Sequence, residues 1–360
     1  MLGILVVGSF NFAGCKKEEK VIKIGAILPL TGKIAFLGEG ERKGFDFAKR
    51  KLKEEGIDQI QVIYEDSKGE SKTAVTVANK LLNQDKVQIL ITSLTSVSYS
   101  VQPLIEKKKD VLQFVVSTDP FIASRAANTF RLYYGLKDEA QVMVKFIKQY
   151  RIKSVGIFYL NIEAYKHEYE KILIPQIKEI VKVEETYDFE TKDYKSLLVK
   201  FKSADVELLI IAGFPHHLGN ILKAIREITL KPKYILANLG FVVGDLGVDP
   251  SVYEGVLFCA PYYLFLKDTS TIKFKQEYRK IIGEDPGYEA ANAYDLLYTV
   301  LGDAIKNTKS LEVNEIKKYI LKKKIFNGVT GKIIFEENGD AHIEVAIGKV
   351  KDGKRILFLK

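Results

Sequence analysis

The stretch that decides the fold is residues 21–32, Val-Ile-Lys-Ile-Gly-Ala-Ile-Leu-Pro-Leu-Thr-Gly. Its first eight residues are mostly aliphatic, and such a nearly continuous apolar run predicts a buried strand over residues 21–28. Residues 42–55 combine charged and apolar side chains at helical spacing, and Gly56 follows them, so we expect an amphipathic helix there. A buried strand followed by such a helix is the opening of a β-α-β unit.

The same alternation continues along the chain. Strands are expected at residues 61–64, 88–92, 111–116, 154–159, 182–187, 207–212 and 234–236, and helices at residues 71–83, 99–108, 138–150, 167–181, 194–202 and 218–229. Strands separated by helices of this length pair in parallel through right-handed crossovers. The fold class is therefore α/β, and two doubly wound lobes of three α/β/α layers account for the series better than one oversized sheet.

The C-terminal part has a different pattern. Helices are expected at residues 272–282, 289–306 and 313–324. Two turn signals follow, Asn338-Gly339 and Asp352-Gly353, each between strand-like runs. An antiparallel set of strands is therefore expected at the C-terminus.

Charge and cysteine content exclude several classes of protein. The 360 residues carry a net charge of +9, but Lys and Glu are interspersed, whereas a nucleic-acid-binding chain would gather its basic residues in an arm or on one helix face. Nucleic acid is therefore not an expected partner. The two cysteines are Cys15 and Cys259, and Cys259 lies in the apolar run 256–260, which predicts a buried, inert thiol.

The N-terminus has the pattern of an export signal. An apolar run over residues 2–13 ends in Phe12-Ala13-Gly14-Cys15 and is followed by the charged residues 16–20. The run is shorter than the ~18–20 residues that span a bilayer, which suits a signal peptide. The segment resembles a bacterial lipobox, which implies that residues 1–14 are removed, that Cys15 is lipidated, and that residues 15–20 link the anchor to the folded part. We therefore expect an exported protein anchored by lipid to the cell envelope.

Four blocks of sequence resemble one known family. They are, in chain order, Ile22 to Gly32 with Gly38 and Gly44; Glu65-Asp66 with Ala74-Val75 and Ala78 to Leu81; Tyr294-Asp295 with Ala304 to Lys306; and Phe326 to Phe335 with Asn338 to Asp340. Their order and spacing resemble the type I periplasmic binding proteins of the leucine/isoleucine/valine-receptor kind, which are substrate-binding components of ABC importers.

The resemblance implies an architecture and a set of partners. The chain would cross between two lobes near residues 134–138, 261–266 and 325–330, with a ligand cleft between the lobes. The N-terminal lobe would then combine residues 21–136 with 266–326, and the C-terminal lobe residues 137–265 with 327–360. A monomer that closes on a small-molecule ligand and delivers it to ABC permease subunits with their ATPase is implied, without a cofactor.

Candidate ligand-binding residues follow two strands of the first lobe. Hydroxyl groups stand where open α/β sheets place their sites, in Thr95-Ser96 ahead of a helix and in Ser117-Thr118-Asp119 after the next strand. By resemblance, Ser96 matches a serine that holds a ligand carboxylate, and residues 117–119 match a segment that binds carboxylate and ammonium. Helix capping and turn formation are the alternative roles for these side chains.

The resemblance also implies apolar and aromatic walls. Leu37 matches a ligand-flanking loop position, and Tyr165 and Phe214 match aromatic positions of the second lobe, unless they belong to the core. The family's amino-acid binders place an acidic residue after the strand 234–236 to pair with the ligand ammonium. This chain has Asn238-Leu239 there, with Leu239 at the matching place. Asp119 is then the candidate counter-charge, and without it an organic acid or an amide is the expected ligand.

Catalytic and metal-binding patterns are weak. The glycines of residues 38–44 stand about eight residues beyond the end of the first strand, too far for a dinucleotide-binding loop. Adjacent His216 and His217 make a poor metal pair, and His167 and His342 are isolated in the sequence. We therefore expect a binding protein with no catalytic or metal site. The alternatives are a ligand sensor for a signalling partner and an enzyme on the same scaffold.

Overall fold

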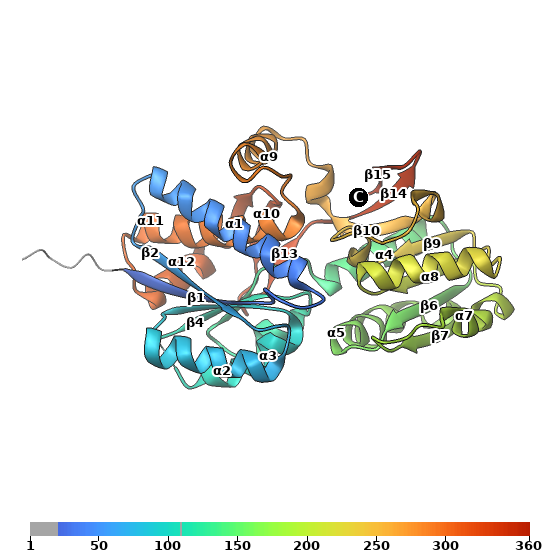
Figure 1. The fold of residues 1–360 in the computed structure, drawn as a ribbon, viewed down its shortest axis with the longest axis horizontal. Helices are drawn as coiled ribbons and strands as arrows, with labels where there is room; N and C mark the ends of the chain where they lie inside the picture. The colour runs from blue at the N-terminus through green and yellow to red at the C-terminus, as the bar shows by residue number, and fades with distance from the viewer. Residues whose placement is uncertain (1–20, 109) are drawn as a thin grey trace, which may run out of the picture.

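The chain folds into two lobes that lie side by side (Figure 1). The structure is a computed structural model and describes residues 21–108 and 110–360. The expected signal peptide, the lipidation of Cys15 and the linker to residue 20 lie outside these residues. No helix in the described ranges is both long enough and apolar enough to cross a bilayer.

The N-terminal lobe is built on a parallel sheet with the strand order β2-β1-β3-β4-β5. Its strands are β1 (Ile22–Leu28), β2 (Ile60–Asp66), β3 (Ile89–Ser93), β4 (Leu112–Val116) and β5 (Thr129–Arg131), and its helices are α1 (Ala35–Glu54), α2 (Ser71–Lys80), α3 (Thr95–Glu106), α9 (Thr269–Ile282), α10 (Tyr288–Tyr294), α11 (Asp303–Thr308) and α12 (Val313–Lys323). Strands β3 and β4 are buried along their whole length, as their continuous apolar sequence predicts.

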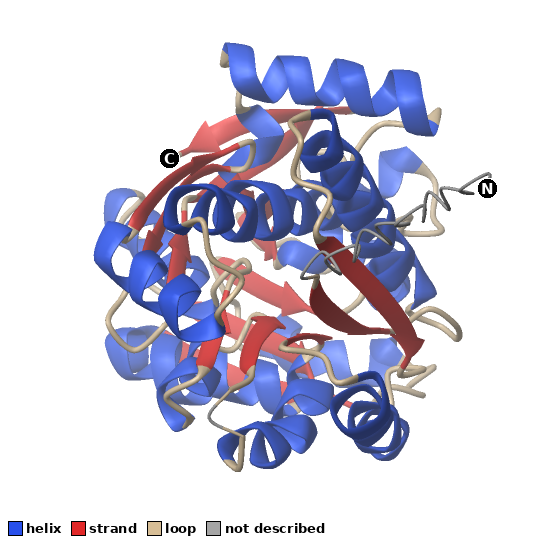
Figure 2. Ribbon diagram, turned by 90° about the vertical axis from the view of Figure 1, so that its left-hand side faces the viewer, coloured by secondary structure: helices blue, strands red, loops and turns tan. Residues whose placement is uncertain are grey.

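The C-terminal lobe has a mixed sheet with the order β15-β14-β10-β9-β8-β6-β7. Its strands are β6 (Val155–Leu160), β7 (Val181–Tyr187), β8 (Leu208–Ala212), β9 (Tyr234–Ala237), β10 (Leu257–Pro261), β14 (Val345–Lys351) and β15 (Lys354–Leu359), and its helices are α4 (Leu136–Gln149), α5 (Glu163–Lys166), α6 (Ile174–Ile177), α7 (Tyr194–Ser203) and α8 (Pro215–Glu227). Strands β14 and β15 join antiparallel. In Figure 2, where the N-terminal lobe faces the viewer, helices surround the central strands. The predicted doubly wound α/β architecture is confirmed.

A small antiparallel sheet of order β11-β12-β13 packs on the N-terminal lobe. Its strands are β11 (Ile325–Gly328), β12 (Gly331–Phe335) and β13 (Ala341–Ile343). The Phe335 ring lies 5.8 Å from that of Phe130, and the Thr330 amide donates to Asp295 at 2.8 Å. The chain thus passes between the lobes after β5, after β10 and between β13 and β14. The third passage differs from the expectation near residues 325–330, and residues 327–343 belong to the N-terminal lobe because the small sheet packs there.

Other expectations differ in detail. The antiparallel C-terminal strands form as predicted, but they are divided between the small sheet and the C-terminal lobe. Helix α1 begins at Ala35, earlier than the expected Arg42, and Leu37, Gly38 and Glu41 in these extra turns are buried. Cys259 is fully buried, which confirms the buried position predicted for it.

One buried ion pair joins the first passage between the lobes to the strand that leads into the third. The side chains of Arg131 and Asp340 are 1% and 4% exposed and form a salt bridge. The Arg131 guanidinium also donates to the carbonyls of Ser117 at 3.1 Å, Tyr133 at 2.8 Å and Ala341 at 2.8 Å. This one side chain therefore connects the end of β5, the loop after β4, the first passage and the start of β13.

Loss of this ion pair is expected to destabilise the whole fold. Asp340→Asn leaves the buried guanidinium without its counter-charge, so the free energy of unfolding should fall by about 3–5 kcal/mol. The control is Asp285→Asn, which breaks the Arg279–Asp285 pair on the surface, where the side chains are 67% and 65% exposed. That change should cost less than about 1 kcal/mol. Urea unfolding followed by circular dichroism measures both, and equal losses would contradict this assignment.

Candidate functional site

A cavity of about 590 Å³ lies between the lobes and is lined from both of them. The sequence-predicted residues found in its lining are Leu37, Thr95, Ser96, Ser117, Thr118, Tyr165, Phe214, Asn238 and Leu239. Those from the N-terminal lobe follow the carboxyl ends of β3 and β4 or lie in α1, and those from the C-terminal lobe follow β6, β8 and β9. The structure therefore brings together residues that lie far apart in the sequence.

Hydroxyl groups form one part of the N-terminal lobe's lining. The Thr95 and Ser117 hydroxyl oxygens are 2.7 Å apart, which joins the loops after β3 and β4. No side chain caps the start of α3, so its first amides are left to other acceptors. Leu94 precedes the helix with φ of +78°, a strained value for this residue that costs about 1–3 kcal/mol. This arrangement of hydroxyls and helix amides suits a carboxylate.

Aromatic side chains form much of the opposite wall. The Tyr165 hydroxyl accepts a hydrogen bond from the Asn238 amide at 2.9 Å, and the Asn238 oxygen accepts from the Gly213 amide at 3.2 Å. Phe214 packs against Phe189 with ring centroids 5.9 Å apart. Phe189 also lines the cavity and was missed by the sequence reasoning. Its place, just after β7, offered no polar or motif signal.

Asp119 does not lie in the lining of this cavity. Its side chain is fully buried, and the carboxylate accepts hydrogen bonds from the Tyr99 hydroxyl at 3.1 Å and the Phe121 amide at 3.0 Å. His167 of the C-terminal lobe approaches it at 2.6 Å through Nδ1. The carboxylate is thus already engaged outside the cavity, which corrects its expected role as the partner of a ligand ammonium.

Two buried acidic side chains line the cavity instead. Glu41 on α1 accepts a hydrogen bond from the Ser93 hydroxyl at 2.8 Å through Oε1, while Oε2 has no partner. Burial raises the pKa of Glu41 to about 8. Glu139 on α4 is 1% exposed, and its Oε1 has no hydrogen-bond partner. The cavity thus presents one such carboxyl from each lobe.

The sequence contained a signal for both carboxyls. Glu139 stands four residues before Met143 and seven before Phe146, and both are fully or almost fully buried. It therefore lies on the apolar face of its helix, where an acidic side chain must be buried. Glu41 has the same spacing to Phe45 and Ala48. The helical period, applied to the acidic residues as well as the apolar ones, would have identified both.

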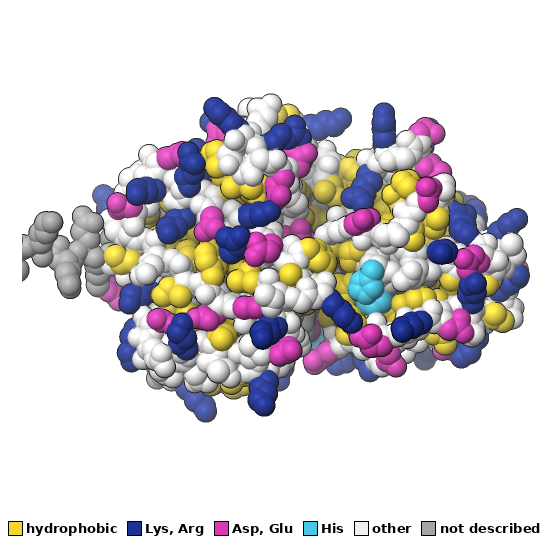
Figure 3. All heavy atoms as spheres, viewed as in Figure 1, with side chains coloured by type: hydrophobic (Ala, Val, Ile, Leu, Met, Phe, Trp, Pro, Cys, Tyr) yellow, Lys and Arg dark blue, Asp and Glu magenta, His cyan; other side chains and the backbone are white. Residues whose placement is uncertain are grey.

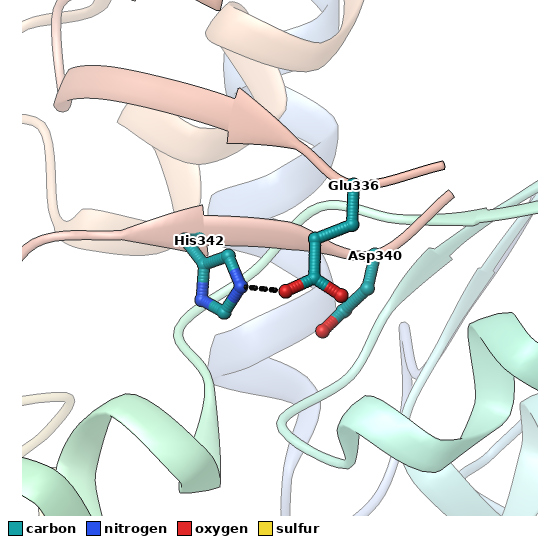
Figure 4. Close-up of side chains that lie close together, drawn as sticks. All are labelled: Glu336, Asp340 and His342. Atoms are coloured by element: carbon teal, nitrogen blue, oxygen red, sulfur yellow. Dashed lines mark hydrogen bonds and ion pairs between the residues drawn. The ribbon is translucent and has the colours of Figure 1, made fainter. Parts of the chain in front are cut away.

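A cluster of acidic residues and a histidine stands at the third passage between the lobes (Figure 4). Potential ligand atoms of Glu336, Asp340 and His342 lie within 4.8 Å of one another. However, His342 bonds Asp138 at 2.9 Å through Nδ1 and Glu336 at 2.5 Å through Nε2, and Asp340 is paired with Arg131. An imidazole that donates from both nitrogens has no lone pair for a metal ion. The cluster is therefore an ionic contact that joins the lobes.

The His342 contacts predict a specific dependence of stability on pH. Hydrogen bonds to Asp138 and Glu336 raise the pKa of His342 to about 9. An unfolded histidine has a pKa of about 6.5, so this stabilisation is complete below about pH 6.5 and disappears as the pH rises through about 9. His342→Gln should remove that part of the profile.

The measurement compares unfolding free energies of the two proteins near pH 6 and near pH 9.5. Buried carboxyls such as Glu41 titrate in the same range in both proteins, so their contribution cancels in the difference. The wild type should be the more stable protein at the lower pH, and the gap should narrow at the higher pH. If the difference in unfolding free energy between the two proteins were the same at both pH values, protonation of His342 would not be linked to folding.

Comparisons with known proteins agree with this geometry. The profile of the family described as "Periplasmic binding protein" matches residues 21–355. A leucine-, isoleucine-, valine-, threonine- and alanine-binding protein of Pseudomonas aeruginosa is 25% identical over 350 residues, which cover 92% of this chain and 90% of the relative.

Solved structures show the same fold. A leucine-binding protein of Thermotoga maritima has a TM-score of 0.80 and 25% identity, with 94% of this chain and 98% of that chain covered. A solute-binding protein of an ABC transporter from Rhodopseudomonas palustris, in complex with 3,4-dihydroxybenzoic acid, has a TM-score of 0.79 and 20% identity, with coverage of 95% and 97%. The chain therefore belongs to the periplasmic binding protein family, a family of ligand receptors and not of enzymes, and it has the type I fold.

Proposed function

We propose that this chain is the extracytoplasmic solute-binding component of an ABC importer, and that it closes on a small ligand carrying a carboxylate. The observation that carries the proposal is the cavity between the lobes, with hydroxyl groups from one lobe and aromatic side chains from the other. The Pseudomonas relative is named for amino acids, and the Rhodopseudomonas structure contains an aromatic acid. A carboxylate is common to both kinds of ligand. An amino acid is the first candidate and a small aromatic acid the second.

The roles of the lining residues follow from their chemistry. Thr95, Ser96, Ser117 and Thr118 hold the ligand carboxylate together with the first amides of α3. Leu37, Tyr165, Phe214 and Leu239 surround its apolar part, and Asn238 fixes the Tyr165 hydroxyl. A ligand that touches both walls binds the closed arrangement of the lobes more tightly than an open one, which is how ligand binding favours closure.

A thermal unfolding screen tests the proposal. The protein from residue 16 onwards is unfolded and refolded to remove carried-over ligand, then heated with amino acids, amides and small carboxylates. A ligand at about 100 times its dissociation constant adds about 2.7 kcal/mol of stability and raises the melting temperature measurably. Ser117→Ala should weaken the response to any carboxylate ligand, because the Thr95–Ser117 contact of the two binding loops is lost.

Two results would speak against the proposal. One is the absence of stabilisation by every compound in the panel. The other is chemical conversion of a stabilising compound, which chromatography of the incubated mixture would reveal and which would favour an enzyme on the same scaffold. Ser203→Ala is the matched serine control, because its hydroxyl makes a local helix contact on the surface and lies outside the cavity lining.

We further propose that Cys15 carries the lipid that holds the protein at the cell envelope. The support is the apolar run before Phe12-Ala13-Gly14-Cys15 and the charged segment after it. Cys15→Ser should release the protein from the detergent-soluble membrane fraction into the aqueous fraction, while Cys259→Ser should leave it at the membrane. Continued membrane association of Cys15→Ser would overturn the lipid anchor without affecting the proposed binding function.

A further inference from the structure

The part of the cavity lining that directly follows β9 carries no charged side chain. Leu239 stands at that place and lines the cavity. The carboxyl group of Glu139, from α4, lies beside the Leu239 backbone amide, and the hydroxyl of Tyr134 is also next to it. Both neighbours favour the ionised form of the carboxyl. Glu139 thus places a carboxyl group at the part of the wall formed by Leu239.

Glu139 is paired with a second buried carboxyl. Glu168, in the helical segment after α5, is fully buried, and its two oxygens have no partner other than Glu139. Burial, together with the neighbouring Glu139 carboxyl, raises the pKa of Glu168 well above its usual range. Burial likewise raises the pKa of Glu139. With a proton on each carboxyl the buried pair carries no charge, and loss of one proton leaves a single carboxylate beside a neutral acid.

In the part of the chain that the structure describes, no cationic side chain is among the groups that act on this pair. The titratable groups that face it are Tyr134 before α4, Tyr165 on α5, Tyr169 beside Glu168, and Cys259 on β10. None of these side chains carries a positive charge in either protonation state. Among the residues that line the cavity within the described ranges, the lysines are Lys33 and Lys68, and both are exposed to solvent. A buried carboxylate without a counter-charge costs several kcal/mol, so the site is suited to a cation supplied by the ligand.

We propose that Glu139 is the counter-charge for a ligand ammonium group and that Glu168 retains a proton beside it, so that binding of the ammonium expels one proton from the site. This inference rests on the proposed solute-binding function and selects amino acids over acids that lack an amine. The Glu139 carboxyl loses its proton to solvent, and the resulting carboxylate accepts hydrogen bonds from the ligand N–H groups. The carboxylate of the ligand remains with the hydroxyls of the N-terminal lobe.

The test uses ligand pairs that differ only in the amine. Wild-type protein from residue 16 onwards is titrated calorimetrically with L-leucine and 4-methylpentanoate, and with L-phenylalanine and 3-phenylpropanoate, in phosphate and in Tris buffer. The difference in heat between the buffers counts the protons released. We expect the amino acid of at least one pair to bind at least about tenfold more tightly than its deaminated partner, which corresponds to about 1.4 kcal/mol. Its binding should release close to one proton and strengthen between about pH 6 and about pH 8.

Variants then identify the group that titrates. Glu139→Gln should abolish proton release and weaken amino-acid binding at least about tenfold, while leaving the deaminated acids near their wild-type affinity. Glu289→Gln is the control, because Glu289 is also a buried carboxyl on a helix but lies outside the lining of this cavity. Its proton release and affinities should match the wild type. Unfolding curves and circular dichroism establish that both variants are folded.

The outcomes separate the two proposals. If the acids bind the wild type as tightly as the amino acids do, or if Glu139→Gln binds and releases protons as the wild type does, Glu139 is not the counter-charge and the solute-binding function stands. If none of these compounds nor any other member of the thermal screen binds the wild type, the solute-binding proposal itself fails and the inference fails with it. If Glu139→Gln does not fold, Glu139→Asp replaces it, and retained proton release with reduced amino-acid affinity supports the proposal.

Discussion

The buried ion pair between Arg131 and Asp340 is the contact that fixes a ligand-binding loop to two of the passages between the lobes. Its guanidinium reaches the loop that carries Ser117, the first passage between the lobes and the start of β13. The ligand-binding loop and the hinge are therefore held by the same side chain. Because a buried charge is stable only with its partner in place, these segments cannot shift independently. Movement between the lobes is then left to the parts of the three passages outside these contacts, including the passage after β10.

The architecture was predictable because parallel strands that are buried on both faces appear in the sequence as continuous apolar runs, as in residues 21–28 and 208–212. The lobe to which the small C-terminal sheet belongs was not predictable in this way. Asn338-Gly339 specifies a turn between neighbouring strands, but the attachment of those strands depends on Phe130 and Asp295, which lie far away in sequence. Local turn chemistry therefore determines pairing, while side-chain packing between distant segments determines the position of the pair.

The site residues were predictable where a polar side chain stands at the carboxyl end of a strand. Hydroxyls at strand ends reach the cavity because the fold directs all such ends to one edge. Asp119 shares that position, but its carboxylate is turned toward His167, a residue 48 positions away in the other lobe. Conversely, Glu139 was hidden by its place in the first turn of a helix, where an acidic residue ordinarily means a favourable interaction with the helix dipole at the surface. On the face shown in Figure 3, exposed acidic and basic side chains are interspersed. Acidic residues are therefore common at the surface of this protein, and its acidic side chain alone did not mark Glu139 as a buried residue.

The discontinuity of both lobes has a consequence for the order in which the protein can acquire its structure. Helix α1 packs on α10, and Lys43 of α1 pairs with Glu284, 241 residues later. The sheet of the other lobe is completed only by β14 and β15, at the end of the chain. Neither lobe can therefore finish folding on the ribosome until the last strands have been made, and contacts of this separation form slowly. A chain that stays unfolded until synthesis ends is well suited to passage through a secretion channel before its sheets close.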